Sequence, residues 1–117
     1  MEKIKVLIAD DHRVVREGLA AILKTKDDIH IVGEAQDGME AVEKVRTLVP
    51  DVVLMDVSMP RMGGVEATRQ IKRECPHIGI VALTMYDEQQ YIFDLVRAGA
   101  TGYLLKDSES SQIVAAM

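Results

Sequence analysis

The sequence is poor in cysteine, and Cys75 is the single one among its 117 residues. One cysteine excludes a disulfide within the chain and a zinc site built from cysteines. The sequence also lacks any apolar run near the ~18 residues that a membrane-spanning helix needs. Its N-terminus has neither the apolar region nor the cleavage site of a signal peptide. We therefore expect a cytoplasmic protein that makes no use of the membrane.

An excess of positive charge is absent as well. Lysine and arginine number 14 against 19 aspartates and glutamates, which gives a formal net charge of −5. An acidic domain has no general electrostatic attraction to nucleic acid, whose phosphates bind basic surfaces. We therefore expect that this domain alone does not bind DNA. The length predicts a single domain over residues 1–117.

Short apolar runs alternate with stripes of apolar residues at helical spacing. The runs predict strands at residues 4–9, 29–32, 52–55, 78–83 and 103–105. The stripes predict helices at residues 15–23, 39–48, 65–71, 91–96 and 108–117. A strand–helix unit repeated in this way predicts an α/β fold, with a parallel sheet and helices on both of its faces. The last helix stops at Met117 without a cap, so we expect it to be truncated.

The residues just after the strands point to a site, because ligands of open parallel sheets bind outside the carboxyl ends of the strands. Asp10 and Asp11 follow the first strand, and Asp56 follows the third. Thr84 and Lys106 follow the fourth and the fifth. A helix cap or a solvated charge explains most of them singly. Asp56 is harder to explain, because it follows four apolar residues and its burial without a partner is costly.

Three carboxylates at one edge repel each other, by roughly 4 kcal/mol per pair at ~4 Å and an effective dielectric constant of ~20. The ammonium group of Lys106 offsets part of that repulsion. A divalent cation is the natural second source of positive charge, and oxygen ligands favour Mg²⁺ over zinc. Such a Mg²⁺ ion usually receives a phosphate oxygen, and a carboxylate can itself be the nucleophile that forms an aspartyl phosphate. The pattern therefore indicates phosphoryl chemistry.

Four stretches of the sequence resemble the receiver domain of two-component response regulators. They are VLIADDH at residues 6–12, DVVLMDVSMPRMGG at 51–64, ALT at 82–84 and GYLLKD at 102–107. The first and the last are most similar to the NarL/LuxR-type transcriptional regulators. The resemblance implies a flavodoxin-like (βα)5 doubly wound parallel sheet with the strand order 2-1-3-4-5.

The resemblance also implies roles for individual residues. Asp56 matches the aspartate that receives a phosphoryl group from a sensor histidine kinase. Asp11, Asp56 and the backbone carbonyl of Ser58 match the direct ligands of Mg²⁺, while Asp10 matches an acidic residue that acts through water. The other matching residues form the switch that responds to the phosphoryl group: Thr84, Lys106 and Tyr103.

The same resemblance implies the partners. Phosphorylation is expected to switch the face made by the fourth helix, the fifth strand and the fifth helix, and to produce a homodimer. The first helix, with Val14, Val15 and Ala21, matches the docking surface for the kinase, although Val15 must lie partly in the core. A helix-turn-helix DNA-binding domain is expected after residue 117 and would make the contact with DNA.

The receiver domain would catalyse its own phosphorylation and dephosphorylation, without being an enzyme in the usual sense. A stand-alone receiver that acts by phosphorelay or protein binding is the alternative.

Two other classes use related sheets and differ after the first strand. Haloacid-dehalogenase-like phosphohydrolases need an Asp-x-Asp motif there, whereas this chain has Asp10, Asp11, His12 and Arg13 in succession. A flavin-binding module needs a phosphate loop rich in Gly, Ser and Thr, and two aspartates would repel the phosphate. We interpret His12 as a residue at the start of a helix and not as a metal ligand.

Overall fold

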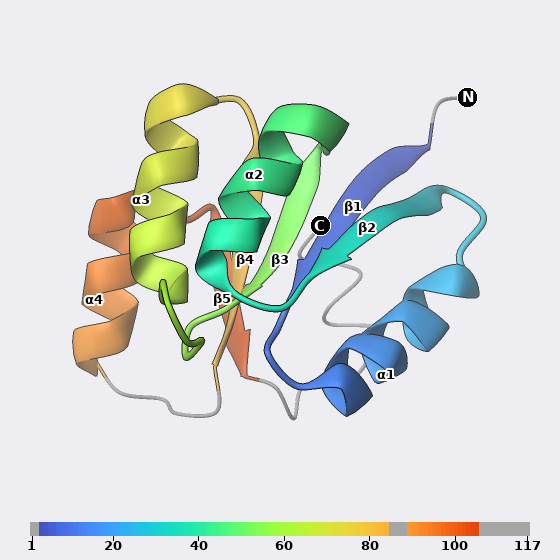
Figure 1. Cartoon of the computed structure of the whole chain (residues 1–117), viewed down its shortest axis with the longest axis horizontal. Coiled ribbons are helices and arrows are strands. Elements are labelled where there is room, and N and C mark those ends of the chain that lie inside the picture. Colours follow the sequence, from blue (N-terminus) through green and yellow to red (C-terminus); the bar gives the residue numbers. More distant parts are fainter. Residues whose placement is uncertain (1–2, 85–88, 106–117) are drawn as a thin grey trace.

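The computed structural model describes residues 3–84 and 89–105, with residues 84, 89–93 and 103–105 described by their backbone. Strands and helices alternate along this part of the chain (Figure 1). The strands are β1 (Ile4–Ala9), β2 (Ile29–Ala35), β3 (Val52–Asp56), β4 (Gly79–Thr84) and β5 (Gly102–Leu105). The helices are α1 (Arg13–Lys24), α2 (Gly38–Leu48), α3 (Gly64–Glu74) and α4 (Gln89–Ala98). The helix expected at residues 108–117 lies outside the described residues.

The strands form one parallel sheet in the order β2-β1-β3-β4-β5. Parallel strands need a crossover connection, and here each crossover between consecutive strands is a helix. The fold class and the strand order that the sequence predicted are both confirmed. Among the described residues, no helix combines the length and the apolar character that crossing a membrane requires.

The helices lie on both faces of the sheet, because successive residues of a buried strand point to opposite sides. On one face, Leu7 and Val53 pack with α2 and α3. On the other face, Ile8 and Leu54 pack with α1. Leu95 of α4 packs with apolar residues of the β3 end and of β4, beside α3. β1 and β3 are therefore covered on both faces, which explains why their sequences read as continuous apolar runs.

β2 is longer than the sequence predicted. The expected strand ended at residue 32, whereas the pairing with β1 continues to Ala35. The partners of Val6 and Leu7 are Ile31 and Gly33, so the register shifts there by one extra residue. Gly33 and Glu34 interrupt the apolar run, but backbone pairing at the edge of a sheet does not require apolar side chains.

α2 ends in a strained residue. Val49 follows the helix with φ 47° and ψ 62°, the left-handed region, and its backbone N–H donates to the Val45 carbonyl at 3.0 Å. A β-branched residue is disfavoured there, because its side chain crowds the backbone. Glycine usually fills this position after a helix. Since Val49 is 48% exposed, little packing offsets the strain.

We expect Val49→Gly to raise the free energy of unfolding by about 1 kcal/mol, as the strain relieved exceeds the entropy that glycine adds to the unfolded chain. Urea unfolding monitored by circular dichroism measures the change. Val49→Ala is the control, because it keeps Cβ and should gain less than the glycine variant. A glycine variant less stable than the native protein would show that the left-handed conformation is not strained.

Candidate functional site

The carboxyl ends of the strands meet at one edge of the sheet. Ala9 of β1 pairs with Met55 of β3, and Asp56 at the end of β3 pairs with Leu83 of β4. The residue that follows β1, Asp10, therefore lies beside Asp56. The parallel register alone brings together side chains that are 46 positions apart in the chain (56 minus 10).

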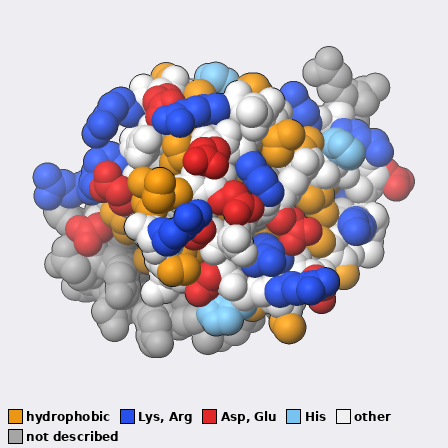
Figure 2. All heavy atoms as spheres, in the orientation of Figure 1, with side chains coloured by type: hydrophobic (Ala, Val, Ile, Leu, Met, Phe, Trp, Pro, Cys, Tyr) orange, Lys and Arg blue, Asp and Glu red, His pale blue; other side chains and the backbone are white. Residues whose placement is uncertain are grey.

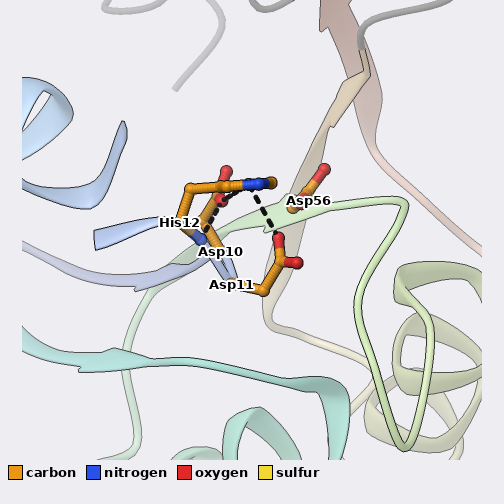
Figure 3. A group of neighbouring side chains, drawn as sticks. All are labelled: Asp10, Asp11, His12 and Asp56. Carbon is orange, nitrogen blue, oxygen red and sulfur yellow. Dashed lines mark hydrogen bonds and ion pairs between the residues drawn. The ribbon is translucent and has the colours of Figure 1, made fainter. Parts of the chain in front are cut away.

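Four side chains gather at this edge (Figure 3). Asp10, Asp11, His12 and Asp56 each offer one ligand atom, and these atoms all lie within 4.8 Å of one another. Asp10 and Asp56 are almost fully buried, at 0% and 2% exposure. Asp11 is partly exposed and His12 mostly exposed. The cluster thus combines two buried carboxylates with one partly exposed carboxylate and a mostly exposed imidazole.

Backbone contacts fix the turn between β1 and α1. The Asp10 N–H donates to the Ala35 carbonyl of β2 at 3.0 Å. The Asp10 carboxylate accepts from the His12 N–H at 2.9 Å, and the Asp10 carbonyl accepts from the Arg16 guanidinium at 2.6 Å. Arg16 also donates to Glu34 on β2 at 3.2 Å. A cation from α1 and a strand on the other side therefore hold the acidic turn in place.

His12 begins α1 as its N-cap residue, but its side chain makes no capping hydrogen bond. Its placement at a helix start is as interpreted from the sequence. Its Nδ1 lies 3.0 Å from Asp11 Oδ1 and 3.5 Å from Asp10 Oδ1, a contact that the sequence did not predict. The ring therefore belongs to the cluster.

The donor set suits a hard divalent cation. Three carboxylates converge within 4.8 Å, and closely spaced carboxylate oxygens are the ligands that Mg²⁺ and Ca²⁺ take up. Asp10, Asp11 and Asp56 would hold such an ion. Bound there, Mg²⁺ would neutralise carboxylate charge and accept a phosphate oxygen. The geometry thus fits the predicted metal, and the ion would relieve the repulsion between the three acids.

The structure places the remaining predicted residues to different extents. Ser58 lies two positions beyond Asp56 and its N–H donates to Asp56 Oδ1 at 3.4 Å. Thr84 ends β4, one residue beyond the partner of Asp56, and its backbone pairs with Leu105. Tyr103 lies in β5, paired with β4 through its backbone. Lys106 lies outside the described residues. The roles predicted for these four residues stay predictions.

Asp37 and Arg61 form a further contact that was not predicted from the sequence. Asp37 is the N-cap of α2 and is 4% exposed; its Oδ1 accepts from the Glu40 N–H at 2.8 Å. Its Oδ2 accepts a hydrogen bond from Arg61 Nε at 2.9 Å and lies 2.8 Å from Arg61 Nη2 in an ion pair. An aspartate followed three residues later by glutamate is a helix-start signal that could have revealed the cap. Nothing in the sequence pairs it with Arg61.

Comparisons with known proteins agree with this geometry. The family described as the response regulator receiver domain matches residues 6–117. The chain belongs to this family. The response regulator GacA of Pseudomonas syringae pv. syringae is 46% identical over 114 residues, which cover 97% of this chain and 53% of that protein. The oxygen regulatory protein NreC of Staphylococcus carnosus is 45% identical over 115 residues, covering 97% and 53%.

Solved receiver structures are also similar. The signal receiver domain of the putative response regulator NarL from Mycobacterium tuberculosis superposes with a TM-score of 0.93 at 35% identity, covering 99% of this chain and 94% of that one. A LuxR-family two-component response regulator from Aurantimonas sp. SI85-9A1 has a TM-score of 0.92 at 33% identity, covering 97% and 81%. The predicted resemblance to NarL/LuxR-type regulators is confirmed. This receiver chain spans about half the length of the curated relatives it matches.

The Asp37 carboxyl of this receiver domain links its stability to pH. Burial raises the pKa of Asp37, but the hydrogen bonds from the Glu40 backbone and from Arg61 outweigh it and hold the pKa below the ordinary value of 3.8. A carboxyl with a lowered folded-state pKa adds stability above that ordinary value and loses it as the pH falls through the folded-state pKa.

We therefore expect Asp37→Asn to lower the free energy of unfolding at neutral pH by about 1–2 kcal/mol, since it removes a charge-assisted contact. The difference from the native protein should shrink below pH 3.8, where the native carboxyl also becomes neutral. Urea unfolding at pH 7 and at about pH 3 measures both differences. An unchanged difference at the two pH values would show that the charge of Asp37 contributes nothing.

Proposed function

We propose that Asp56 is the phosphorylated residue of this receiver domain and that a sensor histidine kinase supplies the phosphoryl group. The supporting observation is the burial of Asp56 within 4.8 Å of two further carboxylates, at the edge where parallel sheets bind their ligands. An isolated buried carboxylate would be costly, and a site prepared for a cation and a phosphate explains why three of them are kept together.

The reaction is a displacement at phosphorus. An Asp56 oxygen attacks, the bond between phosphorus and the imidazole nitrogen of a phosphohistidine breaks, and the freed imidazole takes up a proton from water. An acyl phosphate on Asp56 results. Asp11 and Asp56 would hold a Mg²⁺ ion, with the Ser58 carbonyl as a further proposed ligand and Asp10 acting through water, and the ion would stabilise charge on the phosphoryl oxygens. Small phosphodonors can replace the kinase in the same step.

The switch residues remain part of this proposal. Thr84 is the last residue of β4, the strand that pairs with the end of β3 at Asp56. At this position its hydroxyl group could move toward a phosphoryl group on Asp56. Lys106 and Tyr103 would respond with it, so that the face made by α4, β5 and the segment after β5 changes its populated state. Homodimerisation on that face would pass the signal to a DNA-binding domain in the other half of a longer cytoplasmic protein.

The surface of α1 supports kinase docking beside the site. Val14 is 80% exposed and lies two residues after His12, so an apolar side chain stands next to the acidic cluster. Gly18 and Ala21 continue the same exposed face, and nothing lies within 4 Å of where a Gly18 side chain would begin. A helix of the kinase could approach closely along this smooth face.

Compared with the exposed face of α1 around Val14, Gly18 and Ala21, the face over α2 and α3 is more highly charged. There, positive and negative side chains are interspersed (Figure 2). Arg46 of α2 and Glu74 of α3 form a bidentate ion pair, with both N–O distances at 2.8 Å. A face of mixed charge gives nucleic acid no basic surface to bind, in agreement with the assignment of DNA contact to another domain.

The acceptor can be tested with acetyl phosphate and Mg²⁺. We expect the intact mass to rise by one phosphoryl group, about 80 Da, since Asp56 can attack a small acyl phosphate. Asp56→Asn and a sample with a chelator should show no gain. Asp51→Asn is the matched control, because Asp51 precedes β3 at the opposite end and should leave the gain intact. A full gain in the Asp56 variant would place the acceptor elsewhere.

The docking surface can be tested with the cognate sensor kinase. Among candidate kinases, the cognate one is the kinase that transfers its phosphoryl group to this domain fastest. Val14→Glu should slow transfer from the phosphorylated kinase by about tenfold or more, because a charge would enter an apolar contact. Phosphorylation by acetyl phosphate should not change. Val96→Glu, at a 64% exposed valine of α4, is the control. Equal slowing with acetyl phosphate would mean that the variant harms the site rather than the docking surface.

A further inference from the structure

The loop that follows the acceptor is short and tightly bound at both ends. We call residues 57–63, between β3 and α3, the acceptor loop. At its start the Val57 N–H donates to the Leu83 carbonyl at 3.1 Å, and at its end the Gly64 N–H donates back to the Val57 carbonyl at 2.8 Å. A Cβ on Gly64 would lie 2.1 Å from the Asp56 carbonyl oxygen. The start of α3, directly after the loop, therefore lies against the backbone of the acceptor residue.

The outer part of the acceptor loop is bound to α2. The Met62 carbonyl accepts from the Gly38 N–H at 2.9 Å, and a Cβ on Gly38 would lie 2.2 Å from that same carbonyl oxygen. Beside it, Arg61 Nε donates to Asp37 Oδ2 at 2.9 Å, and Arg61 Nη2 forms an ion pair with the same oxygen at 2.8 Å. Two adjacent residues of the loop are thus attached to two adjacent residues at the start of α2.

Arg61 also has an unfavourable backbone conformation. Its φ is 62°, in the left-handed region that residues with a side chain rarely adopt. Such a conformation persists when surrounding contacts enforce it. The contact that fixes the Arg61 side chain is the ion pair with Asp37, a residue held in place by its own hydrogen bond from Glu40.

From these contacts we propose that Asp37 and Arg61 are positioning residues for the phosphoryl-transfer site. Their ion pair holds the acceptor loop in its strained conformation, and the loop in turn sets the Asp56 backbone and the Ser58 carbonyl. This inference rests on the proposed function of Asp56. Neither residue belongs to the carboxylate cluster, and the route from Arg61 to that cluster runs through the short loop.

A second ion pair between the same layers allows a matched comparison. Arg46 of α2 and Glu74 of α3 form a bidentate ion pair between both carboxylate oxygens and two guanidinium nitrogens, at 2.8 Å each. This pair lies far along both helices and away from the acceptor loop. If an ion pair acted merely by holding α2 against its neighbour, both pairs would affect the site alike. If the acceptor loop is the route, the Asp37–Arg61 pair alone affects it.

The experiment compares Arg61→Ala, Arg61→Gly and Arg46→Ala with the native chain. Calorimetry gives the dissociation constant of Mg²⁺, and intact mass gives the rate of phosphorylation by acetyl phosphate at saturating Mg²⁺. Thermal unfolding monitors stability. Arg61→Ala should weaken Mg²⁺ binding and slow phosphorylation by about fivefold each, because the strained loop conformation loses its support. Arg61→Gly should fall between Arg61→Ala and the native chain, since glycine adopts the left-handed conformation without strain.

Arg46→Ala should leave both site measurements unchanged, whatever its effect on thermal stability. Native-like values for Arg61→Ala, in a native chain that binds Mg²⁺ and becomes phosphorylated, overturn the positioning role and leave the proposed function intact. Equal losses in Arg46→Ala and Arg61→Ala also overturn it. A native chain that neither binds Mg²⁺ nor gains a phosphoryl group overturns both proposals. If Arg61→Ala does not fold, Arg61→Gly is compared with the native chain instead. Weaker Mg²⁺ binding and slower phosphorylation in Arg61→Gly then support the positioning role, and native-like values overturn it.

Discussion

The close approach of three carboxylates at one edge of the sheet is the constraint on which the rest of the structure depends. At ~4 Å and an effective dielectric constant of ~20, each pair of charges opposes folding by roughly 4 kcal/mol. The buried strands β1 and β3 offset this cost, because their apolar side chains are removed from water on both faces. Arg16 and the backbone of β2 then fix the turn that carries Asp10. Burial of apolar side chains in the fold therefore compensates for the repulsion between the carboxylates of the site.

This arrangement leaves the site ready to respond to a cation. A ligand that binds the folded chain and not the unfolded one stabilises it, and here it would also remove a repulsion built into the folded state. The proposed phosphoryl group has the opposite sign and adds about −1.5 to −2 charge at the same edge. An acidic site of this kind can accept that charge only with a cation present. Chemistry at Asp56 and the stability of the domain are therefore coupled through the same few side chains.

Much of this could be predicted from the sequence, because periodicity records burial and a parallel sheet places its strand ends together. The runs around β1 and β3 gave the strands, and the register then brought Asp10 and Asp11 to Asp56. Features that depend on three-dimensional contacts were missed. β2 continues past Gly33 because edge pairing needs no apolar side chain. The contact between Asp37 and Arg61 joins residues 24 positions apart, and no local motif marks either member as a partner of the other.

The two ion pairs that α2 makes with its neighbours differ most in the burial of their carboxylates, since the side chain of Asp37 is 5% exposed and that of Glu74 is 36% exposed. Arg46 and Glu74 have bidentate contacts; their hydrogen bonds raise the pKa of Arg46 and lower that of Glu74, but both side chains are largely exposed. Such a pair adds little, because water competes for both charges. Asp37 is buried; its Oδ1 accepts from the α2 backbone, and its Oδ2 contacts Arg61. Breaking that pair would leave a buried carboxylate without its cation, which is the physical basis of the proposal that the loop beside Asp56 depends on it.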